Sequence, residues 1–314
     1  MAMPMPIFSS TGISISTHDD DHFELNVVGG YQKQIKERMA RSNSHVAIHS
    51  TAASLVIKGG FLDLMRGLPD LDCEVLKRPG YWKSNGTPWQ AVDDGSWEYK
   101  NIKRLVADTW KDYGPGDRGK DAKNLTHNSI EVKSVHRLEN YELWKGFVLG
   151  RDQLIEKNKR SHTETEVKTT TSLKESSSKV GRDVKREANE HYLFHGTRPE
   201  YINNIRKNGL RPEKARSGGM LGKGVYTTES STKADQYADD KDHRTEGPKH
   251  MLLLRVVLGN PYTTTSKNPV KYTSPPDKYD SVIDEYKGRR FREFVVYDWF
   301  MCYPEYFITY NRIG

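Results

Sequence analysis

An α+β fold is predicted by three features of the sequence. Residues 129–138 alternate between apolar and polar side chains, the pattern of a half-buried strand. Residues 251–258 form a continuous apolar run closed by Gly259, Asn260 and Pro261, which indicates a fully buried strand. Few helical patterns and several long loops follow residue 200, and no regular alternation of strand and helix supports a doubly wound sheet.

Composition limits the class of protein. The 314 residues are polar overall, with 35% hydrophobic and 29% charged residues and a formal net charge of +7. The basic excess is spread along the chain, so nucleic-acid binding is possible but unsupported, and most charges are expected on solvated surface. Two cysteines, Cys73 and Cys302, fit a reducing compartment without disulfides. With no signal-peptide pattern and no membrane-length apolar run, we expect an intracellular protein of the nucleus or cytoplasm.

Residues 1–78 are expected to form an N-terminal extension of unknown role. Residues 1–22 are rich in Ser, Thr and Pro and are predicted to be disordered. Helices are predicted around residues 31–41 and 61–67. An acidic stretch flanked by His18 and His22 could bind a metal, but a solvated charge cluster is the preferred interpretation.

A packed domain is expected from residue 79, where aromatic residues become frequent. Residues 98–111 carry an apolar helical face, and a second helix capped by Asn140 should follow the 129–138 strand. A flexible surface insertion is expected at about residues 159–188, since residues 161–178 are rich in Ser, Thr, Lys and Glu. This insertion could be a site of phosphorylation or self-modification.

Residues 192–197, Tyr-Leu-Phe-His-Gly-Thr, are predicted to be a short strand that runs into a polar turn. Thr197 and Glu200 have the spacing of a helix capping box, and Gly209 is suited to end that helix. His195 would then lie where a strand ends, a common place for functional side chains. For one histidine alone, a structural turn residue is the more ordinary interpretation.

Gly222 and Gly224 precede a predicted strand that contains Tyr226. They do not form a dinucleotide fingerprint, because Thr227 stands at the last glycine position and a strand follows instead of a helix. No phosphate-binding P-loop pattern is found. Residues 262–290 are predicted to be a long loop, and residues 294–297 and 306–310 the last strands.

Three blocks in this order resemble the catalytic domain of the poly(ADP-ribose) polymerase family, the diphtheria-toxin-like ADP-ribosyltransferases. The blocks are residues 192–197, 218–238 and 292–298. The family carries a His, a Tyr and usually a Glu on three separated strands, which here would be His195, Tyr226 and Glu293. The resemblance covers residues 79–314 and implies an ADP-ribosyltransferase fold of two packed, mainly antiparallel sheets with flanking helices.

The resemblance implies NAD⁺ as co-substrate and no metal. The reaction, a pentosyl transfer, breaks the bond between nicotinamide and ribose through an oxocarbenium-like transition state. A fixed carboxylate would stabilise the developing positive charge, and Glu293 is the candidate. Tyr226 and Tyr237 would sandwich the nicotinamide ring, and His195 would bind the adenosine ribose.

The remaining cofactor-binding residues are also implied by the resemblance. Gly196 would hold the carboxamide through its backbone, with Thr197 beside it where the family often has Ser. Gly222 and Gly224 would let the backbone pass close to the ligand. Ala234 stands where many members have Ser, so NAD⁺ is expected to bind more weakly by about 0.5–1.5 kcal/mol, unless Thr232 or a water substitutes.

Two questions stay open at the level of the sequence. Glu293 is typical of polymer-forming members, whereas residues 275–281 and 303–310 resemble the mono-ADP-ribosylating branch. We therefore expect mono-transfer or short chains on protein acceptors, with self-modification possible. The alternative is a catalytically weak NAD⁺ or ADP-ribose binding module. The complete set of His195, Tyr226 and Glu293 argues against this alternative, and Ala234 argues mildly for it.

Overall fold

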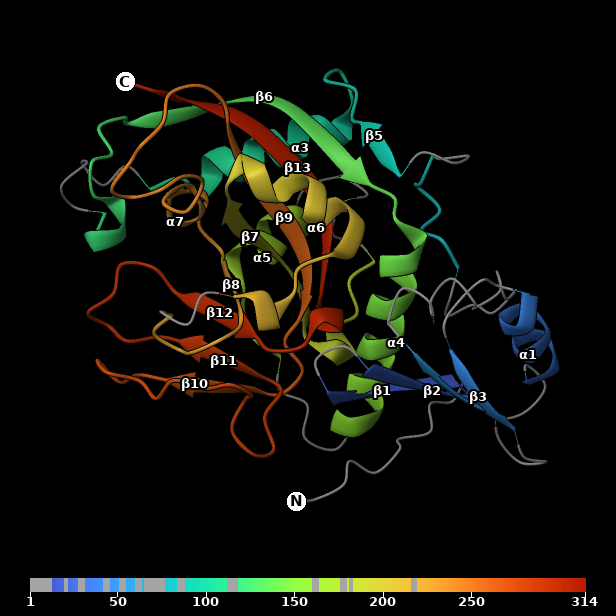
Figure 1. Ribbon diagram of the computed structural model, residues 1–314. Helices are drawn as coiled ribbons and strands as arrows, with labels where there is room; N and C mark the ends of the chain where they lie inside the picture. The colour runs from blue at the N-terminus through green and yellow to red at the C-terminus, as the bar shows by residue number, and fades with distance from the viewer. Residues whose placement is uncertain are drawn as a thin grey trace. The chain divides into compact units, whose positions relative to one another are not determined.

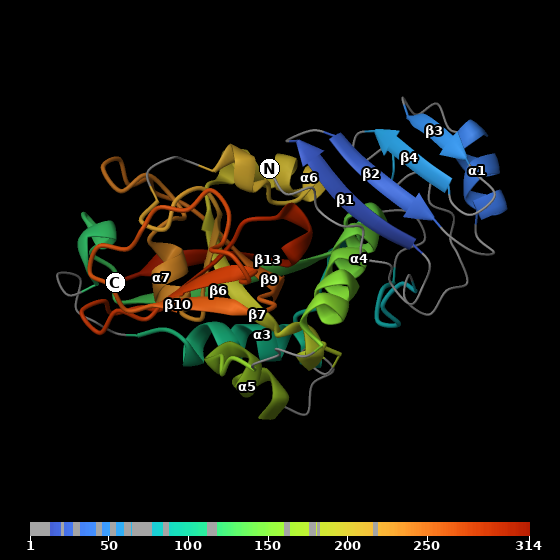
Figure 2. The same cartoon turned by 90° about the horizontal axis from the view of Figure 1, so that it is seen from below.

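The computed structural model describes residues 13–19, 22–27, 32–41, 46–50, 55–59, 64, 77–83, 88–111, 118–159, 164–175, 180, 183–215 and 219–314. The chain divides into two compact units (Figures 1 and 2). One comprises residues 1–82 and 141–160, and the other residues 83–140 and 161–314. No helix in the described part of the chain has the length and apolar character needed to cross a membrane.

The smaller unit contains a four-stranded antiparallel sheet in the order β1-β2-β4-β3. Its strands are β1 (Ile13–Asp19), β2 (His22–Val27), β3 (Ala47–Ser50) and β4 (Leu55–Gly59). α1 (Gln32–Arg41) buries Ile35 and Met39, which are four residues apart and share one helical face. The long helix α4 (Tyr141–Asn158) belongs to this unit and packs against β1.

Two predictions for this unit can be compared with the structure. The helix expected around residues 31–41 is confirmed as α1. Disorder over residues 1–22 is wrong for residues 13–19, because β1 pairs with β2 from Ile13 opposite Val27 onward. The alternation that begins Ile13-Ser14-Ile15 suits a strand, and ladder pairing outweighs the polar composition. The helix expected at residues 61–67 lies, except for Leu64, outside the described residues.

The larger unit is built around a nine-stranded sheet in the order β10-β11-β12-β8-β7-β9-β13-β6-β5. Its strands are β5 (Trp89–Ala91), β6 (Ser129–Leu138), β7 (Glu190–Thr197), β8 (Val225–Thr228), β9 (Lys249–Val257), β10 (Pro261–Thr264), β11 (Ser281–Asp284), β12 (Glu293–Val296) and β13 (Cys302–Ile313). All neighbours are antiparallel except β10 and β11.

The sheet is narrowest between β7 and β8, which pair at a single position, Phe194 opposite Thr228. The four strands from β10 to β8 and the five from β7 to β5 are therefore two halves joined at one residue pair. The predicted α+β class and mainly antiparallel pairing are confirmed. The two halves meet at Phe194, and β7 continues beyond it through Thr197, paired with β9; the polar turn expected at residues 195–197 is therefore absent, because the ladder to β9 extends the strand.

Helices of the larger unit cover the sheet. α3 (Trp97–Asp108) begins at Ser96, whose hydroxyl accepts a hydrogen bond from the Tyr99 N–H, and buries Ile102, Leu105 and Val106 as predicted. α5 (Lys168–Glu175) lies beside α3 (Figure 2). α6 (Ile202–Asn208) ends at Gly209, and α7 (Ser231–Asp235) follows β8. Single 3-10 turns are η4 (Lys120–Ala122), η5 (Arg186–Ala188), η6 (Pro199–Tyr201), η7 (Pro212–Lys214) and η8 (Trp299–Met301).

The hydrophobic core of this unit lies between α3 and the central strands. Ile102 and Leu105 of α3 join apolar side chains of β6, β7, β9 and β13 in one cluster. Residues 251–254 of β9 are all fully buried, on both faces of the strand, which confirms the predicted fully buried strand. This rigid centre carries the strand ends where the candidate site residues lie.

Three local predictions are wrong. The insertion around residues 159–188 contains α5, because Val167 and Leu173 are buried and the Thr169 and Thr170 hydroxyls bond the backbone of Tyr192 on β7. Hydrogen bonds to β7 thus order a segment whose polar composition suggests disorder. The loop expected at residues 262–290 contains most of β10 and all of β11. The capping box is absent, since the N-cap residue of η6 is Arg198 and not Thr197, and neither η6 nor α6 has a side-chain cap.

Candidate active site

Three neighbouring strands carry the His, Tyr and Glu that the sequence singled out. His195 lies on β7, Tyr226 on β8 and Glu293 at the start of β12, and these strands adjoin in the order β12-β8-β7 (Figure 1). His195 Nδ1 lies 2.8 Å from the Tyr226 carbonyl oxygen. The antiparallel ladder thus brings together positions up to 98 residues apart in the sequence.

His195 is half-buried, and burial lowers the pKa of its imidazole, so the ring is neutral near pH 7. A carbonyl oxygen can only accept a hydrogen bond, so the proton of the neutral ring sits on Nδ1. Nε2 is left as an acceptor. This arrangement suits a residue that orients a ligand hydroxyl and does not require it to move protons.

Glu293 is almost fully buried, with 4% of its surface exposed. Burial raises the pKa of its carboxyl group, and the nearby ammonium of Lys233 opposes that shift. Lys233 Nζ lies 3.6 Å from Glu293 Oε1. A carboxylate that is shielded from water and only loosely paired can interact strongly with positive charge on a substrate.

Lys233 and Asp121 join this group, and the sequence analysis missed both. Lys233 Nζ lies 2.9 Å from Asp121 Oδ2 and donates to the Tyr237 hydroxyl at 3.1 Å. The Tyr237 hydroxyl donates to the same Asp121 oxygen at 3.0 Å. Burial alone would lower the pKa of Lys233, but the charges of Glu293 and Asp121 outweigh it and hold that pKa above its usual range. Lys233 is therefore a cation in the site.

The spacing of Lys233 and Tyr237 held a usable signal. They are four residues apart and fall on one side of α7 and the turn after it, where Lys233 Nζ also lies 4.9 Å from the Tyr237 ring centroid. Asp121 gave no such signal, because it precedes Lys233 by 112 residues. Only the folded chain shows that it belongs to the site.

The two site tyrosines differ in what their side chains contact. The Tyr226 hydroxyl accepts a hydrogen bond from the Leu221 N–H at 2.8 Å and donates to the Gly222 carbonyl at 3.0 Å, so it anchors the preceding loop. Tyr237 is 43% exposed. Its ring is therefore the one that offers an accessible aromatic face for a flat ligand.

Gly196 and Gly222 have packing reasons of their own. A Cβ atom on Gly196 would lie 1.8 Å from the Ala234 carbonyl oxygen, so β7 approaches α7 too closely for any side chain. Gly222 has φ +92°, and a Cβ there would lie 1.8 Å from the Tyr272 carbonyl oxygen. A Cβ on Gly224 would likewise lie 2.4 Å from Val295 Cγ1. Whatever their role toward NAD⁺, these glycines are needed for the protein's own packing.

Ala234 and its neighbours bear on ligand affinity. Ala234 is buried in the core cluster, with its backbone against Gly196. Thr232 cannot supply the missing hydroxyl, because its Oγ1 accepts from the Lys111 N–H at 2.6 Å and donates to the Lys111 carbonyl at 3.3 Å. Thr232 is therefore excluded as the substitute hydrogen-bonding group. Thr197 is buried and pairs across the ladder with His250 of β9.

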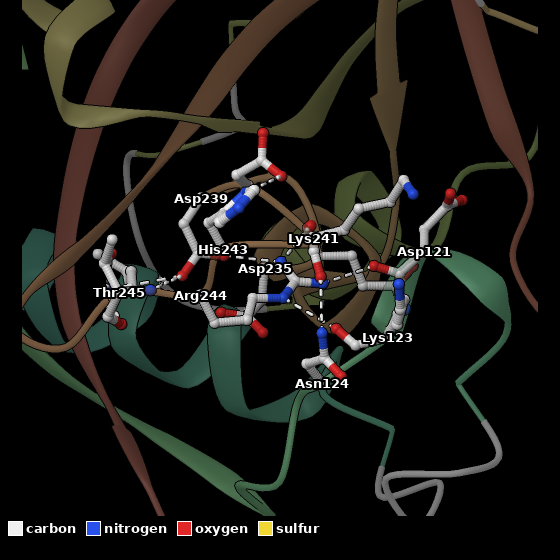
Figure 3. Close-up of polar contacts among 12 residues, drawn as sticks. Asp121, Lys123, Asn124, Asp235, Asp239, Lys241, His243, Arg244 and Thr245 are labelled. Atoms are coloured by element: carbon white, nitrogen blue, oxygen red, sulfur yellow. Dashed lines mark hydrogen bonds and ion pairs between the residues drawn. The ribbon is translucent and has the colours of Figure 1, made fainter.

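Asp121 sits on a segment, residues 118–128, that is fastened to the loop after α7 (Figure 3). Arg244 donates to the carbonyls of Asp121 at 2.7 Å and Lys123 at 3.0 Å, and its guanidinium pairs with Asp239 at 2.6 Å. Arg312 of β13 pairs with both Asp239 and Asp235. His127 Nε2 lies 3.0 Å from Asp235. These hydrogen bonds and ion pairs fasten the 118–128 segment to α7 and the loop after it.

The fold agrees with that of a poly(ADP-ribose) polymerase catalytic domain. The sequence model of the poly(ADP-ribose) polymerase catalytic domain matches residues 120–312, and the chain belongs to this family. The match begins one residue before Asp121 and includes every site residue described above.

Three relatives illustrate the similarity. The human protein mono-ADP-ribosyltransferase PARP11 is 25% identical over 272 residues, which are 76% of this chain and 64% of the relative. Human protein mono-ADP-ribosyltransferase PARP14 is 26% identical over 200 residues, 60% of this chain and 9% of the relative. A probable poly [ADP-ribose] polymerase of Dictyostelium discoideum is 29% identical over 188 residues, 59% of this chain and 46% of the relative. The chain thus spans less than two thirds of these proteins.

Proposed function

We propose that this protein transfers ADP-ribose from NAD⁺ to acceptor proteins and releases nicotinamide. The observation that carries the proposal is the buried, loosely paired carboxylate of Glu293 beside the accessible ring of Tyr237. Membership of the poly(ADP-ribose) polymerase catalytic domain family supports the choice of NAD⁺ as co-substrate.

The residues divide the chemistry among them. The bond between the nicotinamide nitrogen and ribose C1′ breaks, its electron pair leaves with nicotinamide, and positive charge develops on the ribose. The Glu293 carboxylate stabilises this charge and accepts a hydrogen bond from a ribose hydroxyl. The acceptor attacks C1′ and loses its proton, which Glu293 or solvent takes. Tyr237 stacks on nicotinamide, and His195 Nε2 accepts from the adenosine ribose.

Transfer of single ADP-ribose units is the favoured product. Two of the relatives carry mono-ADP-ribosyltransferase in their names. Residues 275–281 and 303–310 resemble the mono-transferring branch. Because Glu293 is typical of polymer-forming members, the proposed product also includes short chains of ADP-ribose units.

We place the protein inside the cell, in the nucleus or cytoplasm, because Cys302 is a buried free thiol and the cysteine content suits a reducing compartment. Its acceptors are proteins, including its own chain. Incubation of the purified protein with labelled NAD⁺, followed by peptide mapping, identifies self-modified residues.

Glu293→Gln tests the proposal. The substitution keeps the size of the side chain and removes its charge, so nicotinamide release should fall by about 10²–10³-fold. Asp108→Asn is the matched control, because Asp108 is exposed on α3 and pairs only loosely with Arg104. Release is measured with NAD⁺ labelled in the nicotinamide ring, and transfer with NAD⁺ labelled in the adenine.

The outcomes separate the two candidate functions. Release and transfer by the wild type that are lost in Glu293→Gln support the transferase. NAD⁺ binding by calorimetry without release by the wild type supports the binding module instead. Equal rates in the wild type and Glu293→Gln would overturn the role of Glu293.

A further inference from the structure

We propose that Asp121 is a positioning residue, which holds the Lys233 ammonium away from full pairing with Glu293. The inference concerns the charges of the site, and its effect on rate rests on the proposed transferase function. Asp121 lies outside the three blocks that carry the family resemblance, and its place in the site emerges only from the tertiary structure.

The distances show an unequal sharing of one cation. Lys233 Nζ is 2.9 Å from Asp121 Oδ2, a hydrogen-bond distance, and 3.6 Å from Glu293 Oε1, which is beyond one. An ammonium group has three donors, and a second one is directed to the Tyr237 hydroxyl at 3.1 Å. Lys233 therefore hydrogen-bonds Asp121 directly, whereas it interacts with Glu293 only through electrostatic attraction.

This sharing matters for the reaction. A carboxylate tied directly to a buried ammonium has much of its charge compensated and offers less to a developing oxocarbenium ion. Burial raises the pKa of Glu293, and the nearby Lys233 ammonium opposes that rise, so the carboxylate form depends on a cation close by. The intermediate arrangement, with Lys233 close but bonded elsewhere, favours the ionised form of Glu293 without a direct ion pair that would compensate its charge.

Asp121 is held in place independently of Lys233. Its carbonyl oxygen accepts from Arg244 at 2.7 Å, and the neighbouring Lys123 pairs with Asp242 at 2.7 Å (Figure 3). These contacts fix the backbone that carries the Asp121 carboxylate without involving Lys233. Loss of the carboxylate charge should leave the segment where it is and move only the lysine ammonium.

Charged and titratable groups reach Glu293 from several elements. They are Lys233 on α7, Asp121 on η4, Asp284 on β11, Tyr226 on β8 and Tyr237 after α7. Asp121 and Asp284 favour the protonated form of Glu293, and Lys233 favours the ionised form. Removing the Asp121 charge should lower the pKa of Glu293 in two ways. It deletes a negative charge that repels the Glu293 carboxylate, and it frees the Lys233 ammonium to approach that carboxylate.

Asp121→Asn tests the proposal, with Asp121→Glu as the conservative rescue and Asp108→Asn as control. In Asp121→Asn, kcat for nicotinamide release should fall about tenfold while KM for NAD⁺ changes less than about threefold. The acidic limb of the pH–rate profile should move to lower pH by roughly one pH unit. Asp121→Glu should restore both quantities toward wild type. Thermal unfolding checks each variant, and Asp121→Ser replaces Asp121→Asn if the latter does not fold.

A second readout does not depend on activity. NMR of protein labelled with ¹³C at the glutamate carboxyls, with the Glu293 signal assigned by its loss in Glu293→Gln, follows the titration of Glu293. A lower midpoint in Asp121→Asn than in wild type supports the proposal, and an unchanged or higher midpoint overturns it. A wild-type protein that releases no nicotinamide would refute the proposed function alone, since the titration still decides the role of Asp121.

Discussion

Gly196 illustrates how one residue serves both the fold and the site. It follows His195 on β7, and its missing side chain lets the strand lie against the end of α7, with Ala234 and Tyr237 as neighbours. The same contact places the Tyr237 ring beside the strand end. The close approach of the β7 backbone to the end of α7 thus sets the geometry of the candidate nicotinamide pocket.

Gly196→Ala should be strongly destabilising, by about 1–3 kcal/mol or more, because its Cβ would overlap the Ala234 carbonyl oxygen. Chemical denaturation measures the free energy of unfolding. Gly95→Ala is the matched control, since its Cβ would meet only the Asp93 carboxylate at an ordinary 3.6 Å. Equal stability of the two variants would show that β7 and α7 are not packed as described.

At the scale of elements, the 118–128 segment and the loop after α7 form one charged network. Arg312 of β13 forms ion pairs with both Asp235 and Asp239, and Arg244 forms a further ion pair with Asp239. Tyr310 donates to Asp235 at 2.7 Å. Burial by itself would raise the pKa of both aspartates, but their basic partners and hydrogen bonds hold each pKa below its usual range.

The sign of the pH dependence follows from these depressed values. A carboxyl group with a lower pKa in the folded state stabilises the protein above its ordinary pKa of about 4 and loses that contribution as the pH falls through the folded value. Stability should therefore decline below about pH 4, measured as the free energy of unfolding in urea. Asp239→Asn should be less stable at pH 6 and show a shallower acid decline. An unchanged slope would contradict the network's role.

Arg244 tests the fastening of the segment more directly. Arg244→Ala removes the hydrogen bonds to the carbonyls of Asp121 and Lys123 and leaves Asp239 with one guanidinium fewer. Amide hydrogen exchange should become faster over residues 118–128, since local opening needs fewer broken contacts. Exchange in β9 should keep its wild-type rate, and faster exchange throughout the larger unit would instead indicate global destabilisation.

At the scale of the whole molecule, the larger unit holds every candidate site residue, and it supports a prediction about product length. Wild-type protein incubated with NAD⁺ should attach single ADP-ribose units, because the relatives named here as mono-transferases share most of this chain. A denaturing gel should show a discrete mass increase, and digestion with mass spectrometry should find one unit per modified residue. A ladder of long polymer would refute mono-transfer and leave the transferase function intact.

The sequence by itself determined the class of fold and the positions of several main strands along the chain, and it singled out three separated candidate residues that the fold brings onto neighbouring strands. It could do so because local patterns carry that information: alternation marks β6, an unbroken apolar run marks β9, and the blocks around His195, Tyr226 and Glu293 are contiguous. Composition misled where it was taken as a sign of disorder. β1 and α5 are polar segments that become ordered through partners on other strands or helices.

Tertiary structure alone decided the partners of the Glu293 carboxylate. Lys233 and Asp121 approach Glu293 from α7 and η4, across 60 and 172 residues of chain, and no local pattern can encode such distances. The same holds for the close backbone contact that requires glycine at position 196 and for the hydroxyl of Thr232, which bonds the backbone of Lys111 beyond α3. Electrostatic and steric effects depend on separation in space, and that separation is fixed only when the sheet and its helices have packed.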